Sequence, residues 1–473
     1  MSNRLDKAYH IENKGLNIIQ EGGIWAVISF AFATIGAFQV YPFIGLADGF
    51  TRWNLALEIV NKGSIQTNNL LSPIIPYIQA ITYQITNSFG FYTLLQAALF
   101  YMAIGALIRL FIGDIYTKFF GKMIPIWIIV SLLILIIPTV YVFPLMLTDS
   151  SPIFILIVFF GWTVLSEMNI RYKATILCVL SFLCVGIRIN SLVMFLFIVL
   201  ICIIKSIYDK RKEYLVYAGT ILFGCVVGTV SVCMLSPSKY NTSTLGMVWE
   251  LVGEAVNTKD KDLIDNLGHY GDIGEAMKRY GDPYLNRIVW DNNPPFPAMK
   301  VAGENSKGIT QIYLNEVFKH PIKFLFNKWY YVDHTLGISA PLVSSRRGVH
   351  GVDDITKSKG ALDTNYQRNL REMFFSTTDK ISVISLRPLC AFFIMIILIL
   401  IAKNLNENNP AYLLFPFLAI AYYSSFCINT QAFEYRYYAP TFYIILCTIF
   451  STVVEIVRLL YVKISNKVKN NDT

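Results

Sequence analysis

Residues 191–208 read SLVMFLFIVLICIIKSIY, and the first charge in this run is Lys205. An uncharged apolar run of about 18 residues is long enough to cross a bilayer as a helix. Runs of this kind recur along the chain, so the sequence predicts an all-α polytopic membrane protein. We expect ten spans, at roughly 22–45, 91–112, 123–143, 152–168, 174–190, 191–208, 214–236, 381–402, 411–430 and 440–461.

The composition excludes the common soluble classes. Of 473 residues, 55% are hydrophobic and 15% are charged, a balance too apolar for a soluble domain. The net charge of +9 does not predict nucleic acid as a partner, because the basic residues cluster in short loops and no nucleic-acid motif accompanies them. All eight cysteines lie in or beside apolar segments without CxxC spacing, which favours buried thiols over disulfides or a metal site.

The basic residues also predict the topology. Short cytoplasmic loops of membrane proteins carry an excess of Lys and Arg. If both termini are cytoplasmic, the ten spans place the basic loop clusters on the cytoplasmic side: Arg4, Lys7, Lys14, Arg109, Lys118, Lys122, Arg171, Lys173, Lys205, Lys210, Arg211, Lys212, Lys403, Arg458, Lys463, Lys467 and Lys469. The loops 46–90, 144–151 and 431–440 then lie outside.

Three regions follow from this topology. Residues 1–236 form an N-terminal membrane core with the first external loop, and residues 381–473 form the C-terminal membrane helices. Between them, 237–380 is polar and too long for a simple loop. Its stretches 247–256 and 308–319 have helical character and 291–297 is rich in turn residues, so we expect an external cap of mixed structure.

The first external loop places an acid and an arginine at the membrane boundary. Residues 47–54 read ADGFTRWN, with Asp48 and Arg52, and they lead into an amphipathic stretch whose apolar face holds Trp53 and Leu57. A second such stretch, 70–87, follows. Both are expected to be juxtamembrane helices that lie in the interface. They form either a lipid-facing platform beside an active site or an ordinary membrane-skimming loop.

Three further polar groups are expected on the same side. Asp149 precedes a helix start, where capping is the simpler interpretation. Arg188 and Asn190 end a span, where the arginine needs an acid, a phosphate or the headgroup layer. Glu434 and its neighbours Arg436 and Tyr437 precede the last span, where an aromatic belt explains the tyrosine and a phosphate clamp would explain the arginine.

Together these groups match the needs of glycosyl transfer from a lipid phosphate. A carboxylate can take the proton of an acceptor hydroxyl as the new bond forms. Arginines can stabilise the charge that builds on the departing phosphate. Amphipathic helices can admit a polyprenyl tail from the bilayer.

The same residues resemble the GT-C superfamily of polyprenyl-phosphate-sugar glycosyltransferases. The segment 47–54 is similar to the acidic motif of that family's first external loop. Leu147-Thr148-Asp149 looks like its second acid, Arg188-Ile189-Asn190 resembles an Arg-x-Asn of bacterial members, and 434–440 (EYRYYAP) looks like its late Glu-x-Arg-Tyr segment. The resemblance covers roughly 20–208 and 410–460 and leaves the cap unassigned.

The resemblance implies a hexosyltransferase of a bacterial inner membrane, with its active site external. Asp48 would be the catalytic base of an inverting transfer, and Asp149 would orient the acceptor or hold an ion. Arg52, Arg188 and Arg436 would bind the donor phosphate, with Asn190, Glu434 and Tyr437 in support. The donor would be a polyprenyl (undecaprenyl) phosphate sugar, and the acceptor a glycan or glycolipid such as the O-antigen of lipopolysaccharide. The best match for the sugar is glucose.

The resemblance also bears on cofactors. Many relatives have two adjacent acids in the first motif, whereas Gly49 follows Asp48 here, which weakens the case for a divalent cation. Histidines of the cap such as His269, His334 and His350 are spread without metal-ligand spacing. Asp260-Lys261-Asp262 has the DxD pattern of nucleotide-sugar enzymes but stands in a polar, lysine-rich stretch, which favours a solvated face. No metal-ligating residues are therefore predicted, and a divalent cation stays open as a cofactor.

Two other functions remain open. A flippase for lipid-linked saccharides would place charges in the middle of its spans, whereas here the acids crowd one surface. A polysaccharide polymerase or ligase would share the polytopic plan but use a lipid-diphosphate oligosaccharide. The position of Asp48 at the membrane boundary favours the glycosyltransferase.

Overall fold

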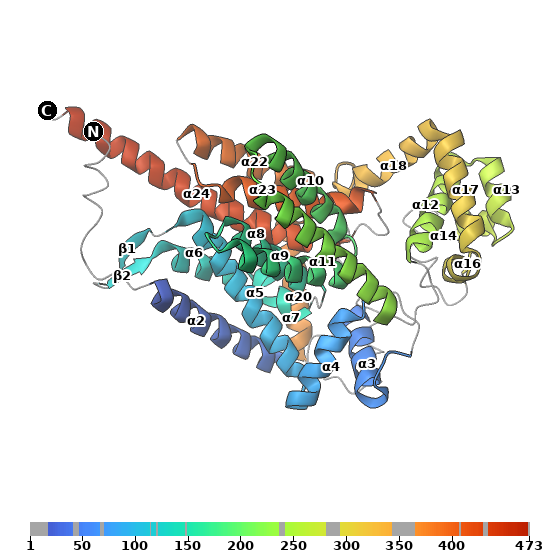
Figure 1. The fold of residues 1–473 in the computed structure, drawn as a ribbon, viewed down its shortest axis with the longest axis horizontal. Helices are drawn as coiled ribbons and strands as arrows, with labels where there is room; N and C mark the ends of the chain where they lie inside the picture. The colour runs from blue at the N-terminus through green and yellow to red at the C-terminus, as the bar shows by residue number, and fades with distance from the viewer. Residues whose placement is uncertain are drawn as a thin grey trace.

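The computed structural model describes residues 18–40, 47–66, 71–113, 115–119, 122–146, 149–235, 242–280, 294–342, 365–405, 408–428 and 434–471. The protein is almost wholly helical in these ranges, and its one sheet is a two-stranded hairpin. A large helical bundle occupies most of the molecule, and a group of shorter helices lies beyond one end of it (Figure 1). The expectation of a helical membrane protein is confirmed at this level.

Six helices of the described chain are long and apolar enough to cross a membrane. They are α2 (Ile18–Gln39), α5 (Phe89–Ile112), α9 (Ile170–Ile187), α10 (Ser191–Asp209), α11 (Glu213–Leu235) and α24 (Tyr435–Asn471). Three expected spans are shorter apolar helices: α8 (Ser150–Leu165), α22 (Pro388–Asn404) and α23 (Ala411–Ile428). Helical structure is thus present in every predicted span. Only six helices of the described chain meet the length and composition of a span by themselves, and a bent pair of helices, described next, would be a seventh.

The expected single span at 123–143 is broken. It consists of α6 (Ile126–Leu135) and α7 (Pro138–Met146), which meet at 71°. Pro138 lacks a backbone N–H and disfavours helical geometry at the residue before it. The sequence predicted a span here but not its break, because an apolar pattern does not register a break at its centre. The predicted span at 381–402 also begins later, at Pro388, after the short helix α21 (Ser382–Ser385).

Close helix contacts in the bundle depend on small residues. Helices α9 and α11 pack together along their length. A Cβ atom added at Gly224 of α11 would lie 2.2 Å from the Ser181 hydroxyl and 2.4 Å from the Cys178 carbonyl oxygen. Glycine at this position lets the two backbones approach as closely as they do. The tight connection expected between 174–190 and 191–208 is a short turn from Arg188 to Asn190.

The chain path defines two ends of the bundle. Helix α3 (Ala47–Lys62) lies where α5 begins, and we call this the Asp48 end. Helix α2 begins and α5 finishes at the opposite end, which we call the Glu21 end because Glu21 lies 3.5 Å from Arg109 there. The hairpin of β1 (Tyr116–Phe119) and β2 (Lys122–Pro125), with Tyr116 opposite Pro125, lies at the Glu21 end.

The two predicted amphipathic stretches are helices at the Asp48 end. They are α3 and α4 (Ile74–Thr86), which pack against each other (Figure 1). The buried face of α3 is formed by Leu55, Ala56 and Ile59, whereas Trp53 and Leu57 are only partly buried. The buried face of α3 is therefore rotated relative to the predicted apolar face. The hydrophobic pattern alone did not show which side of α3 is covered by α4.

The shorter helices beyond the Asp48 end form a separate unit. Its members are α12 (Thr242–Thr258), α13 (Lys261–Gly268), α14 (Ile273–Tyr280), α16 (Ala298–Glu304), α17 (Ser306–Lys319) and α18 (Pro321–Thr335). We call it the α12–α18 unit; it has its own hydrophobic core, which includes Leu251 and Phe296. The mixed structure expected for the cap was wrong for the described part of 237–380, where every regular element is a helix. Part of the turn-rich stretch 291–297 lies outside the described residues.

Two helices join the α12–α18 unit to the bundle. Helix α18 leads back to α23, where the Tyr423 hydroxyl donates to the Thr335 carbonyl at 2.6 Å. Helix α20 (Asn365–Lys380) then packs against α7, and its Phe374 contacts Tyr435 at the start of α24. These connections place the unit next to the residues at the Asp48 end.

Candidate functional site

Five of the predicted charged residues meet at the Asp48 end. Asp48 and Arg52 come from α3, Asp149 from the turn before α8, Arg188 from the end of α9, and Arg436 from the first turn of α24. We call these five residues the arginine cluster. Three guanidinium groups and two carboxylates from four separate segments therefore share one site. The hypothesis that residues from all four sequence motifs lie together agrees with this geometry.

Asp149 is the buried centre of the cluster. The Nη2 and Nε atoms of Arg188 donate to its Oδ2 atom at 2.6 and 3.2 Å. Nη2 of Arg52 lies 3.4 Å from the same oxygen, with the Arg52 side chain 3% exposed. The simpler interpretation of Asp149 as a helix cap was wrong, because its side chain makes no capping hydrogen bond to α8. The carboxylate is turned toward the arginines instead.

The ionisation of Asp149 follows from this environment. Burial alone would raise the pKa of its carboxyl group, but the guanidinium groups of Arg188 and Arg52 outweigh burial and hold the pKa well below its usual range. Asp149 is therefore an anion at any physiological pH. Because it is already engaged by two cations, it is suited to positioning them and poorly suited to taking a proton.

Arg188 is held by aromatic groups as well as by the acid. Its Nη1 atom donates to the Tyr422 hydroxyl at 3.4 Å, and its guanidinium lies 4.8 Å from the centre of the Tyr437 ring. The interpretation that Arg188 reaches toward lipid headgroups is wrong, since its side chain is only 11% exposed and points into the protein.

Arg436 forms the outer part of the cluster. Its Nη1 atom is paired with Asp48, and Nε lies 2.7 Å from Oε2 of Glu434. Its Nη2 atom donates to the Tyr437 hydroxyl at 3.0 Å, and the guanidinium lies 4.9 Å from the centre of that ring. Tyr437 thus contacts both Arg188 and Arg436 and connects the two halves of the cluster.

The two halves differ in their access to solvent. Arg52, Asp149 and Arg188 form a buried inner half, whereas the side chains of Asp48 and Arg436 are 24% and 21% exposed. The Ser150 hydroxyl donates to the Arg436 carbonyl at 2.7 Å, which fixes the outer half to the start of α8. A ligand arriving from solvent or from the interface would meet Asp48 and Arg436 first.

The sequence prediction of the site included Asn190, which lies outside the arginine cluster, and missed three residues that lie beside the cluster. Asn190 directly precedes α10 without a side-chain capping bond, and its side chain is not among the hydrogen-bond partners of Arg188 in the described structure. Ser150, Tyr422 and Tyr92 were not predicted; Tyr92 is buried in the field of Arg52 and Asp149. The serine and the tyrosines carry no periodic or charge signal that would have distinguished them from ordinary helix residues.

The residues of this site do not fit a divalent cation. Within the described part of the chain, no group of three or more His, Cys, Asp or Glu side chains is arranged to hold a metal. Asp48 and Asp149 are each paired with arginine, which repels a cation. The cysteines are free thiols in the described structure.

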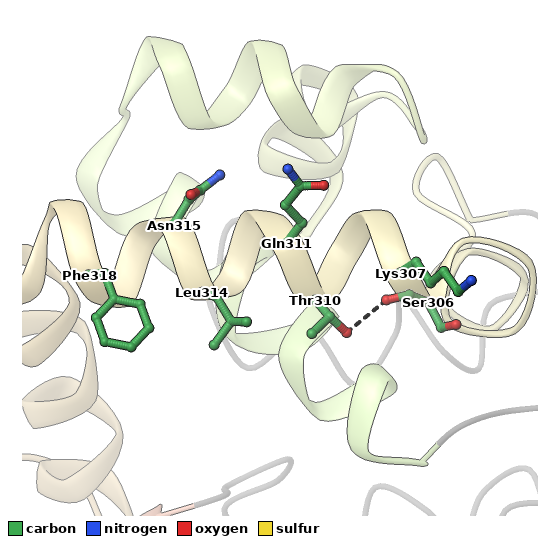
Figure 2. Close-up of a pocket in the computed structure, with 7 residues that line it drawn as sticks. All are labelled: Ser306, Lys307, Thr310, Gln311, Leu314, Asn315 and Phe318. Atoms are coloured by element: carbon green, nitrogen blue, oxygen red, sulfur yellow. Dashed lines mark hydrogen bonds between the residues drawn. The ribbon is translucent and has the colours of Figure 1, made fainter.

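Neither the DxD pattern nor a surface hollow on α17 forms a second charged site in the described part of the α12–α18 unit. Asp260 caps α13 through the Leu263 N–H at 3.0 Å and pairs with Lys323, so the DxD pattern is structural. A hollow of about 540 Å³ lies along one side of α17 and is open to solvent (Figure 2). Its lining comes from a single helix and contains Lys307 as its charged residue, so we place the site at the arginine cluster.

Comparisons of the chain with protein-family models, curated proteins and solved structures return no match.

Proposed function

We propose that the protein is a membrane glycosyltransferase that moves a hexose from a polyprenyl phosphate to a cell-surface glycan. The observation that carries the proposal is the arginine cluster. Arginine matches the paired oxygens of a phosphate, and a carboxylate beside it can accept a proton. Both groups stand in the more exposed half of the cluster, as Arg436 and Asp48.

The two acids have different roles in this proposal. Asp149 holds Arg52 and Arg188 in place, and its low pKa makes it a weak base. Asp48 is paired with Arg436 and lies in the more exposed half of the cluster. We therefore assign the base to Asp48 and the positioning role to Asp149.

The reaction follows from exchange of partners at Arg436. The donor phosphate takes the place of Asp48 on the Arg436 guanidinium, which releases the carboxylate. The acceptor hydroxyl oxygen then attacks C1 of the sugar, the bond from C1 to the phosphate oxygen breaks, and Asp48 takes the hydroxyl proton. The arginines stabilise the second negative charge on the departing polyprenyl phosphate.

The topology belongs to the same proposal. The three shorter helices and the bent pair would bring the crossings to ten. Four basic residues would lie at the Glu21 end: Arg171 and Lys212 where α9 and α11 start, and Lys205 and Lys403 where α10 and α22 finish. This excess of basic residues favours a cytoplasmic Glu21 end. The Asp48 end and the α12–α18 unit would then be external, in a bacterial inner membrane, with glucose and the O-antigen as the preferred sugar and acceptor. The unit would act as a cap that helps to bind the acceptor.

The test is transfer of labelled glucose from undecaprenyl-phosphate glucose to glycolipid in membranes that contain the chain. The Asp48→Asn variant should lose activity by at least about 100-fold while it inserts and accumulates normally. Asp265→Asn, at an exposed acid of α13, is the matched control and should be fully active. Full transfer by Asp48→Asn would overturn the assignment of the base.

A second arm separates the competing functions. The same membranes are supplied with a lipid-diphosphate oligosaccharide instead of the monophosphate sugar. Turnover of this donor alone would identify a polymerase or ligase. Movement of labelled donor across sealed vesicles without release of the lipid phosphate would identify a flippase.

A further inference from the structure

An exposed apolar stripe crosses the corner between α17 and α18. Phe318, Ile322, Leu325, Phe326 and Trp329 follow helical spacing, and their side chains are 60 to 78% exposed. We call these five residues the α17–α18 apolar face. Leu314 extends it along α17 and, with Phe318, points away from Gln311 and Asn315 (Figure 2). Large apolar side chains exposed this close together in sequence on a polar unit indicate a partner or a membrane.

Lysines predominate among the charged residues on the two helices that form this face. Residues 306–330 contain four lysines, Lys307, Lys319, Lys323 and Lys328, and one acid, Glu316. Glu316 is buried, and Lys323 and Lys328 pair with Asp260 and Glu250 of neighbouring helices, so the positive charge of this surface comes from Lys307 and Lys319. A helix with Phe, Leu and Trp on one face and lysines beside it is typical of segments that lie in the headgroup layer of a bilayer.

The fold limits how far this face can be from the bilayer. The Leu389 N–H donates to the Leu336 carbonyl at 3.0 Å, which fixes the end of α18 beside the first turn of α22. Arg387 reinforces this junction by donating to the Gly337 and Ile338 carbonyls, each at 2.9 Å. At about 1.5 Å rise per residue, Trp329 lies within about 10 Å of the junction and Ile322 within about 21 Å.

The junction is continuous with an apolar surface on the bundle. Phe393 and Ile397 of α22 are 57% and 55% exposed and begin one turn beyond the junction. Figure 1 shows α18 leaving the bundle obliquely rather than continuing the direction of the long helices. An oblique helix that starts at the lipid-facing surface stays close to the bilayer over its length.

We propose that the α17–α18 apolar face lies in the headgroup layer of the bilayer and docks the α12–α18 unit onto the membrane. Trp329 and Phe326 reach the acyl boundary, and the lysines contact lipid phosphates. This docking requires that the chain spans a membrane, but it does not depend on the proposed glycosyl transfer.

The test uses environment-sensitive labels on the full-length chain in nanodiscs that hold one copy. Cysteines are introduced as Phe326→Cys and Asn315→Cys in a Cys233→Ser background and labelled with a small neutral fluorophore. Labelling of the background chain is subtracted. Each sample is quenched with nitroxide-bearing lipid and, separately, with aqueous iodide.

The label at 326 should emit at shorter wavelength than the label at 315, respond to the nitroxide lipid and resist iodide. The label at 315 should respond to iodide alone. Iodide quenching at 326 equal to that at 315 would overturn the proposal. Protection at 326 from both quenchers would also overturn it, because another segment of the chain would then cover the face.

A second variant tests the energetics without a label. Phe326→Asp should release the unit from the bilayer and raise amide exchange of α18 in nanodiscs, whereas Asn315→Asp should leave it unchanged. The bulk fold should survive both changes because both side chains are exposed. Unchanged exchange in Phe326→Asp would count against docking.

Discussion

The two ends of the bundle each pair an arginine with an acid, but they do so in different ways. At the Glu21 end, Arg109 lies 3.5 Å from a Glu21 side chain that is 0% exposed, and the Tyr116 hydroxyl donates to Glu21 at 2.5 Å. Arg109 also lies over the Trp127 ring. This is a local anchor that ties α2 to the end of α5 and to the hairpin.

The Asp48 end contains three arginines, more than a local structural ion pair requires. Three arginines and two acids from four segments meet there, and Arg436 and Asp48 remain more than a fifth exposed. A pair that only stabilises the fold gains nothing from solvent access, since water weakens its attraction. Arg109 is itself 23% exposed, so the contrast lies in the acids: Glu21 is fully buried, as in a structural anchor, whereas Asp48 is 24% exposed, which supports the proposed role of the Asp48 end in binding a ligand.

The largest expected effect comes from removing one arginine at each end. Arg109→Gln leaves Glu21 buried without its cation and should cost about 3–5 kcal/mol of stability. Arg436→Gln removes the proposed ligand of the donor phosphate from a partly exposed site and should reduce the proposed transfer by roughly 100- to 1000-fold with little loss of stability. Thermal unfolding in detergent and turnover of undecaprenyl-phosphate glucose measure the two quantities.

Double variants that neutralise both members of an ion pair test the difference between the two ends further. Glu21→Gln added to Arg109→Gln removes the orphaned charge and should restore most of the lost stability. Asp48→Asn added to Arg436→Gln should restore no transfer. If the second pair regains activity, the Asp48 end is an anchor like the Glu21 end.

Much of this arrangement could be predicted from the sequence, and the reasons for the misses are physical. Apolar runs such as 191–208 predicted helices, and charged residues at their ends predicted a polar site. Which charges meet could not be predicted, because Asp48 and Arg436 are 388 positions apart and their contact depends on how the helices pack. Arg109 was assigned to topology alone, although it also binds Glu21. Asp149 stands where capping residues occur, and only its neighbours show that it does not cap.

A smaller effect is expected from removing one hydroxyl at each end. Tyr116→Phe deletes a hydrogen bond to a buried carboxylate and should cost about 1.5–3 kcal/mol of stability. Tyr437→Phe keeps the ring that contacts Arg188 and Arg436, and should cost less than about 1 kcal/mol. The same thermal unfolding assay compares them, and equal losses would remove the distinction between the two ends.

The smallest effect concerns an acid that, unlike those at either end, has no hydrogen-bonding partner. Glu254 of α12 is 0% exposed, and neither of its carboxylate oxygens is hydrogen-bonded in the described structure. Glu250, by contrast, pairs with Lys328 and accepts from the Tyr313 hydroxyl at 2.7 Å. Burial, and then the neighbouring Glu316, raises the pKa of Glu254 from 4.5 to about 7, although Lys323 opposes the rise.

The sign of the pH dependence follows from that raised pKa. Between about pH 4.5 and pH 7 the folded protein binds the Glu254 proton more tightly than the unfolded chain does, so stability falls as pH rises through this window. Glu254→Gln should raise stability by on the order of 1 kcal/mol at pH 8 and change little at pH 5. Glu250→Gln, the matched control, should lower stability at pH 8 because it leaves Lys328 unpaired. An effect of Glu254→Gln that is the same at both pH values would mean that Glu254 is already charged in the folded protein and that, like the acids at the two ends of the bundle, it is balanced by a cation.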